Sequence, residues 1–310
     1  MPRKSAAGIQ ERSATDVVLF DTYSVVFRAF HALPPLSTST GVPSSALYGF
    51  SSLVLKVLRE QGPSELAFAV DGPSRTFRAE RYPEYKAGRP RTPSALSQEL
   101  ERLPRLLEAF EVPVFCTPGF EADDVLATLA RRIAGTGRQV LVVSGDRDLL
   151  QTAGERTRIL FLGRRAQPAE LYDAARVEAR FGVSPAKLPV FTALVGDPSD
   201  HLVGVAGVGP RTAAELVARF GSIGELLAHL DDVSPLKLRE TLREAAERLV
   251  MNEMLARLHD DVPLATSMLS APLTESSRRR LAAEFEALEY KSLLLRLERL
   301  KVRGDSAGLA

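Results

Sequence analysis

The sequence has few of the residues that mark secreted, zinc-binding or membrane-spanning proteins. Its 310 residues include one cysteine, four histidines and no tryptophan. A single cysteine cannot form an internal disulfide. Cys116 follows an apolar run at 112–115, so we interpret it as a small core residue rather than a nucleophile. No run of about 18 apolar residues occurs, and the sequence therefore predicts no membrane span.

The N-terminal segment lacks the pattern of a secretory signal. Residues 1–15 are polar and mixed in charge, without the apolar stretch that such a signal needs. We expect a disordered leader at 1–15, a tail at 301–310 and a cytoplasmic location. Because no segment suggests an obligate interface between subunits, we also expect a monomer.

The first half of the chain alternates short apolar runs with amphipathic stretches. Runs rich in β-branched or aromatic residues predict buried strands at 17–20, 66–70, 112–115, 140–143 and 159–162. Helices are predicted near 46–60, 95–110 and 122–134. Strands that alternate with helices indicate an α/β core at 16–167, with a mostly parallel sheet covered on both faces.

After about residue 168 the pattern becomes almost wholly helical. Leucines recur among charged residues at helical spacing between 226 and 258, and 273–300 predicts two more amphipathic helices. The sequence shows no repeat of solenoid length and no low-complexity tract. We therefore expect a helical subdomain at 168–300 that follows the α/β core.

Acidic residues cluster where the predicted strands end and helices begin. Asp21 and Asp71 directly follow two strands, and the pair Asp146 and Asp148 follows another. The carboxyl ends of parallel strands form the crevice in which ligands bind to an open sheet. A helix N-terminus also favours nearby negative charge. The full candidate set is Asp21, Asp71, Glu121, Asp123, Asp124, Asp146, Asp148, Asp197 and Asp200.

Two of these clusters have an ordinary structural explanation. Helix capping alone accounts for the acids at 121–124, and a plain turn accounts for 145–148. Convergence weakens both explanations, because packing many carboxylates at one crevice is unfavourable without a counterion. Oxygen ligands without a Cys or His cluster favour Mg²⁺ or Mn²⁺ over zinc. Two such ions about 4 Å apart would activate water and stabilise the attacking and leaving oxygens in phosphoryl transfer.

The net charge of +1 conceals a separation of charge. The nine candidate carboxylates contribute −9, so the rest of the chain carries +10. Metal ions would neutralise the acidic site and leave the basic surface to attract phosphates. The near-neutral total therefore does not exclude a nucleic-acid partner.

Residues 75–91, between the second strand and the helix near 95–110, are basic. Six arginines or lysines stand there against two glutamates, with Phe77, Tyr82 and Tyr85 interleaved. Phosphate pairing combined with base stacking is typical of single-strand binding. A solvated surface loop is the alternative, but the position shortly after Asp71 favours a function.

A glycine-rich segment at 204–213 follows the last acidic pair. Gly204, Gly207 and Gly209 permit a close backbone approach, and Pro210 suits the first turn of a helix at about 211–220. Such a loop presents N–H groups to a phosphate. No strand precedes it, which argues against a dinucleotide-binding fingerprint, whereas a purely structural turn stays open as an alternative.

Seven motifs, in order, resemble those of one family. They lie at 19–21 with 27–34, 70–71 with 76–78, 85–89, 119–125, 145–148, 196–200 and 207–209. Over roughly 16–300 the chain resembles the 5′ nuclease domain of bacterial DNA polymerase I and its stand-alone homologues, in the flap endonuclease superfamily. The resemblance implies a PIN-like α/β fold with a helical arch at about 75–110 over the active site. It also implies a helix–three-turn–helix, with its hairpin at 203–213, in the C-terminal helical subdomain.

The resemblance assigns roles to individual residues. Asp21, Asp71, Glu121 and Asp123, with Asp124 adjacent, resemble the first metal site, and Asp146, Asp148, Asp197 and Asp200 resemble the second. Lys86 and Arg89 fall where the arch supplies cations to the scissile phosphate. DNA contacts are implied for Arg28, Arg78, Tyr85, Gly207, Gly209 and Arg211. A K⁺ ion in the hairpin is implied, bound by the backbone of Leu194, Val195, Val203, Val205 and Val208.

Two positions depart from the family pattern. After Asp200 the family usually has Asn, an apolar residue and Pro, whereas this chain has His201, Leu202 and Val203. The first change adjoins the second metal set, and the loss of proline adjoins the K⁺ loop. Neither change removes a ligand side chain, so activity is still expected.

These features predict a structure-specific 5′ nuclease, a 5′-3′ exonuclease or flap endonuclease that hydrolyses DNA phosphodiesters with two metal ions in replication and repair. DNA with a 5′ flap or 5′ end is the expected substrate. A DNA polymerase, in cis or in trans, is the expected partner. Two alternatives stay open: a branched-DNA-binding protein with impaired catalysis, and a related metal-dependent ribonuclease.

Overall fold

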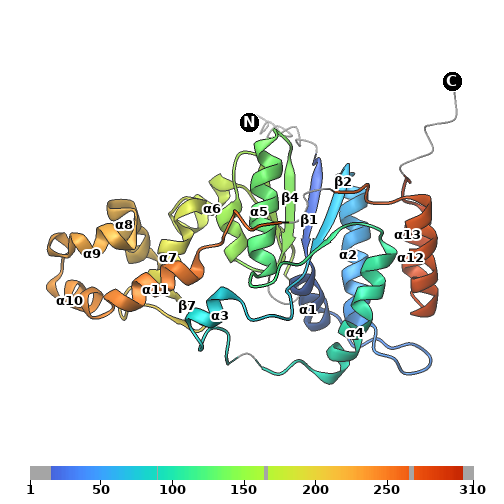
Figure 1. Cartoon of the computed structure of the whole chain (residues 1–310), viewed down its shortest axis with the longest axis horizontal. Coiled ribbons are helices and arrows are strands. Elements are labelled where there is room, and N and C mark those ends of the chain that lie inside the picture. Colours follow the sequence, from blue (N-terminus) through green and yellow to red (C-terminus); the bar gives the residue numbers. More distant parts are fainter. Residues whose placement is uncertain (1–14, 89, 164–166, 265–268, 303–310) are drawn as a thin grey trace, which may run out of the picture.

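A six-stranded sheet forms the centre of the protein, whose computed structural model describes residues 15–88, 90–163, 167–264 and 269–302. The strand order is β3-β2-β1-β4-β5-β6, and all neighbours are parallel except the edge pair β5 and β6 (Figure 1). The strands are β1 (Val17–Asp21), β2 (Glu65–Ala69), β3 (Val114–Phe115), β4 (Val140–Ser144), β5 (Thr157–Phe161) and β6 (Glu170–Tyr172). The predicted α/β class with a mostly parallel sheet is confirmed.

Helices cover both faces of the sheet because side chains alternate along each strand. Val18 and Phe20 of β1 belong to one hydrophobic cluster, with α1 (Thr22–Ala32), α2 (Ser45–Gln61) and α4 (Ser94–Ala109). Val17 and Leu19 belong to the opposite cluster, with α5 (Ala122–Gly135) and much of the following helical region. Every residue of β1 and β4 is buried, as expected for central parallel strands.

A helical subdomain extends from one end of this sandwich (Figure 1). Its helices are α6 (Ala174–Phe181), α7 (Leu188–Val195), α8 (Pro210–Phe220), α9 (Ile223–Ala228), α10 (Leu236–Glu244) and α11 (Ala246–Ala256). Short 3₁₀ turns lie at η1 (Asp148–Thr152), η2 (Pro185–Lys187) and η3 (Leu230–Asp232). Between α7 and α8, β7 (Gly196–Asp197) and β8 (Leu202–Val203) form a two-residue antiparallel ribbon.

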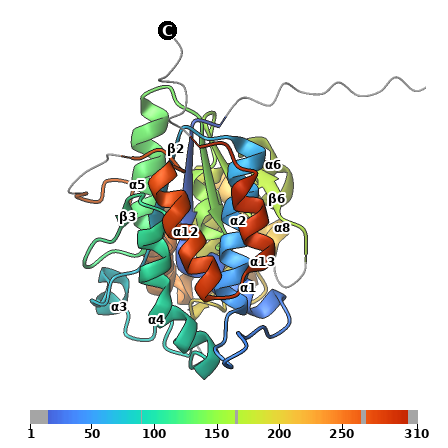
Figure 2. The same cartoon turned by 90° about the vertical axis from the view of Figure 1, so that its right-hand side faces the viewer.

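The last two helices return to the α/β core. Figure 2 shows α12 (Glu275–Ala287) and α13 (Lys291–Glu298) lying over α2 and α4. Leu281 and Phe285 are fully buried there with Leu96 and Phe110. The expectation that all of 168–300 forms one helical subdomain is therefore wrong for 275–298. The apolar face of these helices covers the outer side of α2 and α4 instead.

Most of the predicted elements occur at the predicted places. The helices expected near 46–60, 95–110 and 122–134 correspond to α2, α4 and α5, while the strand expected at 112–115 is reduced to β3. The sequence prediction missed α1, the short helix α3 (Phe77–Arg81) and β6. The expected leader and tail lie almost entirely outside the described residues. In the described part of the chain, no helix is both long and apolar enough to cross a membrane.

Candidate active site

Acidic side chains line one groove at the carboxyl end of the sheet. The groove has a volume of about 480 Å³ and is lined by Asp21, Asp71, Glu121, Asp123 and Asp146, together with Lys86. These acids come from the ends of β1, β2 and β4 and from the start of α5. The structure thus brings together residues that the sequence separates by as many as 125 positions.

Asp21 illustrates how the fold positions each acid. It ends β1 and caps α1, with Oδ1 accepting the Ser24 N–H at 3.2 Å. Its other oxygen, Oδ2, accepts the Ser144 hydroxyl from the end of neighbouring β4. The pKa of Asp21 is raised to about 7, and burial is the largest cause. The hydrogen bond from Ser144 lowers the pKa, whereas the charges of Asp146 and Asp71 raise it.

Two more carboxyls in this region share that unfavourable environment. Burial, followed by the charge of Asp146, raises the pKa of both Asp123 and Asp148 well above the ordinary range. Asp200 and Asp197 also raise the pKa of Asp148, which links the groove to the turn after α7. The region therefore contains more carboxylate than the protein alone keeps ionised.

Asp197 and Asp200 lie on β7 and in the turn that follows it. Oδ2 of Asp197 accepts a hydrogen bond from Arg147 Nη2 at 3.1 Å, and Oδ1 accepts one from the Ser199 N–H at 2.8 Å. Oδ2 of Asp200 accepts the Tyr85 hydroxyl at 2.9 Å. Both aspartates are buried and hydrogen-bonded, so their carboxylate oxygens have defined positions beside the groove.

The acids fit a hard cation by chemistry but are not gathered around one point. Among the described residues, no three His, Cys, Asp or Glu side chains are arranged so that they could hold a metal ion. Several oxygens accept hydrogen bonds from the protein, as Asp71 Oδ1 does from the Ala122 N–H at 2.8 Å. Carboxylate oxygens are nevertheless the donors that Mg²⁺ and Mn²⁺ prefer, and the raised pKa values mark a site that a cation would stabilise.

Asp124 departs from its expected role as a metal ligand. Its two oxygens accept hydrogen bonds from Arg78, from Nη1 at 2.7 Å and from Nη2 at 2.8 Å. They also accept the backbone N–H of Glu121 at 3.1 Å and of His259 at 2.8 Å. The side chain is fully buried. With four donors already bound, Asp124 is a structural anchor, and its assignment to the metal set is wrong.

Arg78 was expected to contact DNA, but its side chain is only 1% exposed. Besides Asp124, it donates to the backbone carbonyls of Leu255 at 2.8 Å and Arg257 at 2.9 Å. These bonds connect α3, the start of α5 and the end of α11. Because the guanidinium is enclosed, Arg78 fixes the core against the helical subdomain and is not available to a phosphate.

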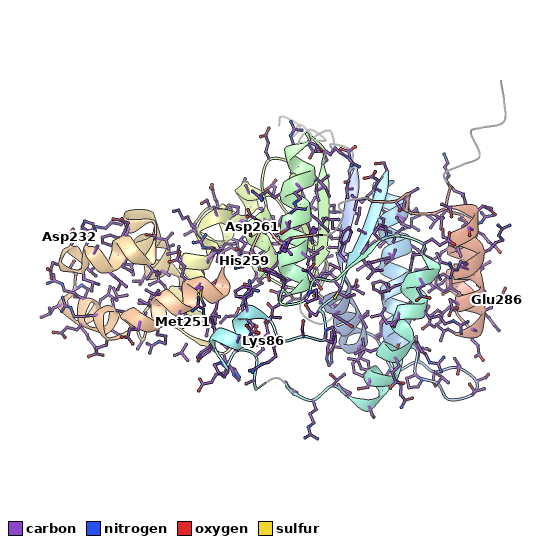
Figure 3. All side chains as sticks on the ribbon, in the orientation of Figure 1. Lys86, Asp232, Met251, His259, Asp261 and Glu286 are labelled. Atoms are coloured by element: carbon purple, nitrogen blue, oxygen red, sulfur yellow. The ribbon has the colours of Figure 1, made fainter. Side chains whose placement is uncertain are left out.

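Tyr85 and Lys86 reach the acids from the segment after α3. The Tyr85 hydroxyl donates to Glu121 Oε2 at 3.1 Å and to Asp200 Oδ2 at 2.9 Å. Its ring is buried with Leu202 and Leu255, so the expected base stacking does not fit this structure. Lys86 Nζ lies 3.0 Å from Glu121 Oε1 and 3.8 Å from Asp200 Oδ2, below His259 in Figure 3. Arg89 lies outside the described residues.

The other expected DNA contacts lie at two separate places. Arg28, on α1, is half-buried and donates from Nη2 to the Gln167 carbonyl at 2.9 Å. Arg211, in the first turn of α8, is highly exposed beside Glu215. Gly207 and Gly209 precede that helix, and Gly207 has a left-handed φ of 80°. The hairpin therefore presents an open backbone next to an exposed cation.

Close packing shapes the hairpin itself. A Cβ on Gly204 would lie 2.3 Å from the Val195 carbonyl oxygen, so only glycine fits there. Of the carbonyls expected to bind K⁺, three accept hydrogen bonds within the protein: Leu194 from Val205 N–H, Val205 from Val208 N–H, and Val203 from Asn252 Nδ2. Each carbonyl keeps a second lone pair for a cation.

Sequence reasoning missed several residues that support the acids. The Ser144 hydroxyl donates to Asp21, the Ser199 hydroxyl donates to Asp197, and the Ser24 hydroxyl accepts the Gly145 N–H. Buried Asn252 donates to the Ala193 and Val203 carbonyls. The three serines lie one to three residues from a candidate acid, which was the available signal. Cys116 is exposed beside Gly72, so its interpretation as a core residue is wrong.

The chain matches two family models in succession. Residues 16–182 match the 5′-3′ exonuclease N-terminal resolvase-like domain, and residues 183–279 match the 5′-3′ exonuclease C-terminal SAM fold. DNA polymerase I of Bacillus caldotenax is 36% identical over 282 residues, which cover 91% of this chain and 32% of the relative. DNA polymerase I of Mycobacterium tuberculosis is 37% identical over 299 residues, 96% of this chain and 33% of the relative. The chain thus spans about a third of the length of these relatives.

The fold is also similar to that of a solved bacteriophage protein. The T5 5′-exonuclease with bound divalent zinc ions aligns with a TM-score of 0.64 and 21% identity, covering 92% of this chain and all of that one. This likeness supports the arrangement of sheet and helical subdomain described above.

Proposed function

Because the chain belongs to the 5′-3′ exonuclease family, we propose that it hydrolyses DNA phosphodiesters at 5′ ends and flap junctions with bound divalent cations. The observation that supports this most strongly is the convergence of Asp21, Asp71, Asp123 and Asp146 on one groove from separate elements. Burial and mutual repulsion raise the pKa of two of them. Such a site favours hard cations and, through them, phosphate.

The groove acids would hold the cations as two neighbouring groups. Asp21, Asp71, Glu121 and Asp123 form the group nearest α5, and Asp146, Asp148, Asp197 and Asp200 form the group toward the helical subdomain. We assign one ion to each group, with Mg²⁺ or Mn²⁺ as the cation that suits all-oxygen donors. When bound, the cations supply an activated water and stabilise charge on the phosphate oxygens.

The remaining residues would position the DNA. Lys86 places an ammonium group at the edge of the acids, where it would face the phosphate that enters the groove. Arg28 on α1 and Arg211 beside the hairpin would contact the sugar-phosphate backbone on either side. The hairpin carbonyls would hold K⁺ and stiffen this second contact. Since the curated relatives are polymerases, we propose that a DNA polymerase acts on the same substrate, in cis or in trans.

Cleavage of a 5′-flapped duplex, labelled on the flap strand, tests the proposal. With Mg²⁺, the protein should release product at the junction, and EDTA should stop it. Asp146→Asn should lower the rate by about 100-fold or more while DNA binding in Ca²⁺ persists, since each tenfold in rate reflects about 1.4 kcal/mol. Asp232→Asn is a matched control at the far end of the helical subdomain (Figure 3).

Three results would contradict the proposal in different ways. Normal cleavage by Asp146→Asn would remove the acidic groove from the reaction. Tight Mg²⁺-dependent binding of the flap without cleavage by the wild-type protein would favour a branched-DNA-binding function instead. Cleavage restricted to an RNA version of the flap strand would favour the ribonuclease alternative.

A further inference from the structure

The turn that carries Asp200 contacts the segment that carries Lys86. We call residues 82–88 the arch base. The Tyr85 hydroxyl donates to Asp200 Oδ2 at 2.9 Å, and the Lys86 N–H lies 3.5 Å from the Asp200 carbonyl oxygen. These contacts join the middle of the arch base to the turn, and within the arch base the Ala87 N–H donates to the Glu84 carbonyl oxygen at 3.1 Å.

His201 adds a further contact to the arch base from the next position of the turn. Its Nδ1 lies 3.1 Å from the Glu84 carbonyl oxygen. Because a carbonyl only accepts, Nδ1 carries the hydrogen in this bond. The imidazole also lies next to Gly88, where a Cβ would approach the ring carbon Cε1 to 2.3 Å. The ring therefore fills the space that any larger residue at position 88 would occupy.

The backbone at both residues is adapted to this contact. His201 and Lys86 have left-handed φ values of 59° and 57°, which are uncommon for residues other than glycine. The left-handed turn at Lys86 accompanies the direction of its side chain toward Glu121, with Nζ at 3.0 Å. Glu84 and Gly88, the two residues that His201 contacts, flank Lys86 on either side by two residues.

We propose that His201 is a positioning residue, which holds the arch base so that the Lys86 ammonium stays at the acidic groove. This inference rests on the proposed nuclease function, because it assigns to Lys86 a role in the reaction. His201 is not among the residues that line the groove. Its removal should loosen the arch base around Glu84 and Gly88, while the bond between Tyr85 and Asp200 remains, and let the Lys86 ammonium move away from the groove. Cleavage would then slow more than DNA binding weakens.

A double-mutant cycle separates this role from simple surface packing. His201→Ala should lower kcat about tenfold with little change in KM, since small misplacements of a reacting group are costly. Lys86→Met should lower kcat further, and His201→Ala should then have no added effect in that variant. Multiplicative losses in the double variant would overturn the proposal. His229→Ala, at an exposed histidine on the far side of the helical subdomain, is the matched control and should leave kcat unchanged.

Conservative variants identify the contact that matters. His201→Asn places an amide Nδ2 where the imidazole Nδ1 lies, so it should keep the bond to Glu84 and most of the rate. Asparagine also adopts a left-handed φ readily. Gly88→Ala should reproduce the loss in His201→Ala, because its Cβ displaces the ring. If Asn at 201 is as slow as Ala, or Gly88→Ala is as fast as wild type, His201 does not act through the arch base.

Hydrogen exchange provides a readout that does not depend on catalysis. In the metal-free protein, amides of 82–88 should exchange faster in His201→Ala than in wild type or in His229→Ala. Unchanged exchange overturns the proposal whatever the cleavage result. If the wild-type protein fails to cleave the flap while exchange changes as expected, the proposed function fails but the contact between His201 and the arch base stands.

Discussion

At the scale of single residues, the ion pair of Arg78 and Asp124 shows how much depends on one enclosed contact. Both side chains are almost completely buried, and Arg78 also binds the carbonyls at 255 and 257. A buried ion pair is favourable only when every donor and acceptor has a partner. Here the partners come from α3, α5 and the end of α11, so the pair joins three parts of the fold.

Loss of Arg78 should therefore destabilise the whole protein. Arg78→Met leaves the carboxylate of Asp124 buried without its counterion, so the free energy of unfolding should fall by about 3–5 kcal/mol. Urea denaturation followed by circular dichroism measures this change. Arg59→Ala, which breaks an exposed pair with Glu60, should cost at most about 1 kcal/mol. A loss of that small size in Arg78→Met would mean that the pair does not stabilise the fold.

The candidate acids were predictable residue by residue, but their partners were not. Asp21, Asp71 and Asp146 follow strands directly, and parallel strands bring such positions to one edge. Asp124 lies beside Asp123 in the first turn of α5, yet its oxygens bind Arg78, which stands 46 residues earlier in the chain. Only the folded arrangement of α3 against α5 distinguishes this structural acid from the others.

At the scale of elements, the C-terminal helix pair completes the core. Phe285 and Leu281 of α12 and Leu293 of α13 are fully buried against α2 and α4. The Tyr290 hydroxyl, between the two helices, donates to the Ser44 carbonyl that precedes α2. The pair therefore belongs to the sandwich in packing, although it follows the helical subdomain in sequence.

Truncation inside this helix pair should affect the core. Phe285→Ala should lower the free energy of unfolding by about 3–5 kcal/mol, because it removes a fully buried ring. Leu295→Ala, on α13 but 56% exposed, should change it by no more than about 0.5 kcal/mol. Thermal denaturation of both variants provides the comparison. Equal small effects would show that α12 is dispensable for the sandwich.

Local patterns predicted the elements better than their packing. The 3.6-residue spacing of leucines and phenylalanines indicated two helices in 273–300, as found. The same spacing fits any apolar partner, so it did not reveal that α12 and α13 lie on α2 and α4. In contrast, α1 was missed because it begins at Thr22 with no loop after β1, and Asp21 serves both as strand end and as helix cap.

At the scale of the whole molecule, the acidic groove makes the fold sensitive to cations. Burial and neighbouring charges raise the pKa values of Asp21, Asp123 and Asp148, so the ionised groove opposes folding when no cation is bound. Mg²⁺ or Mn²⁺ should therefore raise the melting temperature of the protein in EDTA-free buffer. At 100 times the dissociation constant the gain is about 2.7 kcal/mol.

The same measurement on Asp146→Asn provides the control. This variant should melt at a higher temperature than wild type in EDTA, because it removes a charge that raises the pKa of all three neighbours. It should gain less from Mg²⁺. An equal gain in both proteins would place the cation outside the groove.

The sequence revealed that strands and helices alternate in the first part of the chain and that helices dominate the rest. The core of alternating strands and helices and the later helical region both appear as predicted. What the sequence did not reveal is the path of the chain between them. Residues 259–262 run back along α5, with Val262 N–H donating to Thr128 and Arg131 and Arg132 holding the carbonyls of 260 and 262. Those contacts are long-range, and no local pattern specifies them.

This return path has a consequence for how the protein is made. Synthesis proceeds from the N-terminus, so the sheet and its first helices leave the ribosome long before 275–298 exists. Until then, the side of α2 and α4 that α12 and α13 will cover stays exposed. The helical subdomain is thus completed while the sandwich behind it is still open. The helices α12 and α13, which are made last, therefore complete the packing of α2 and α4 in the first half of the sequence.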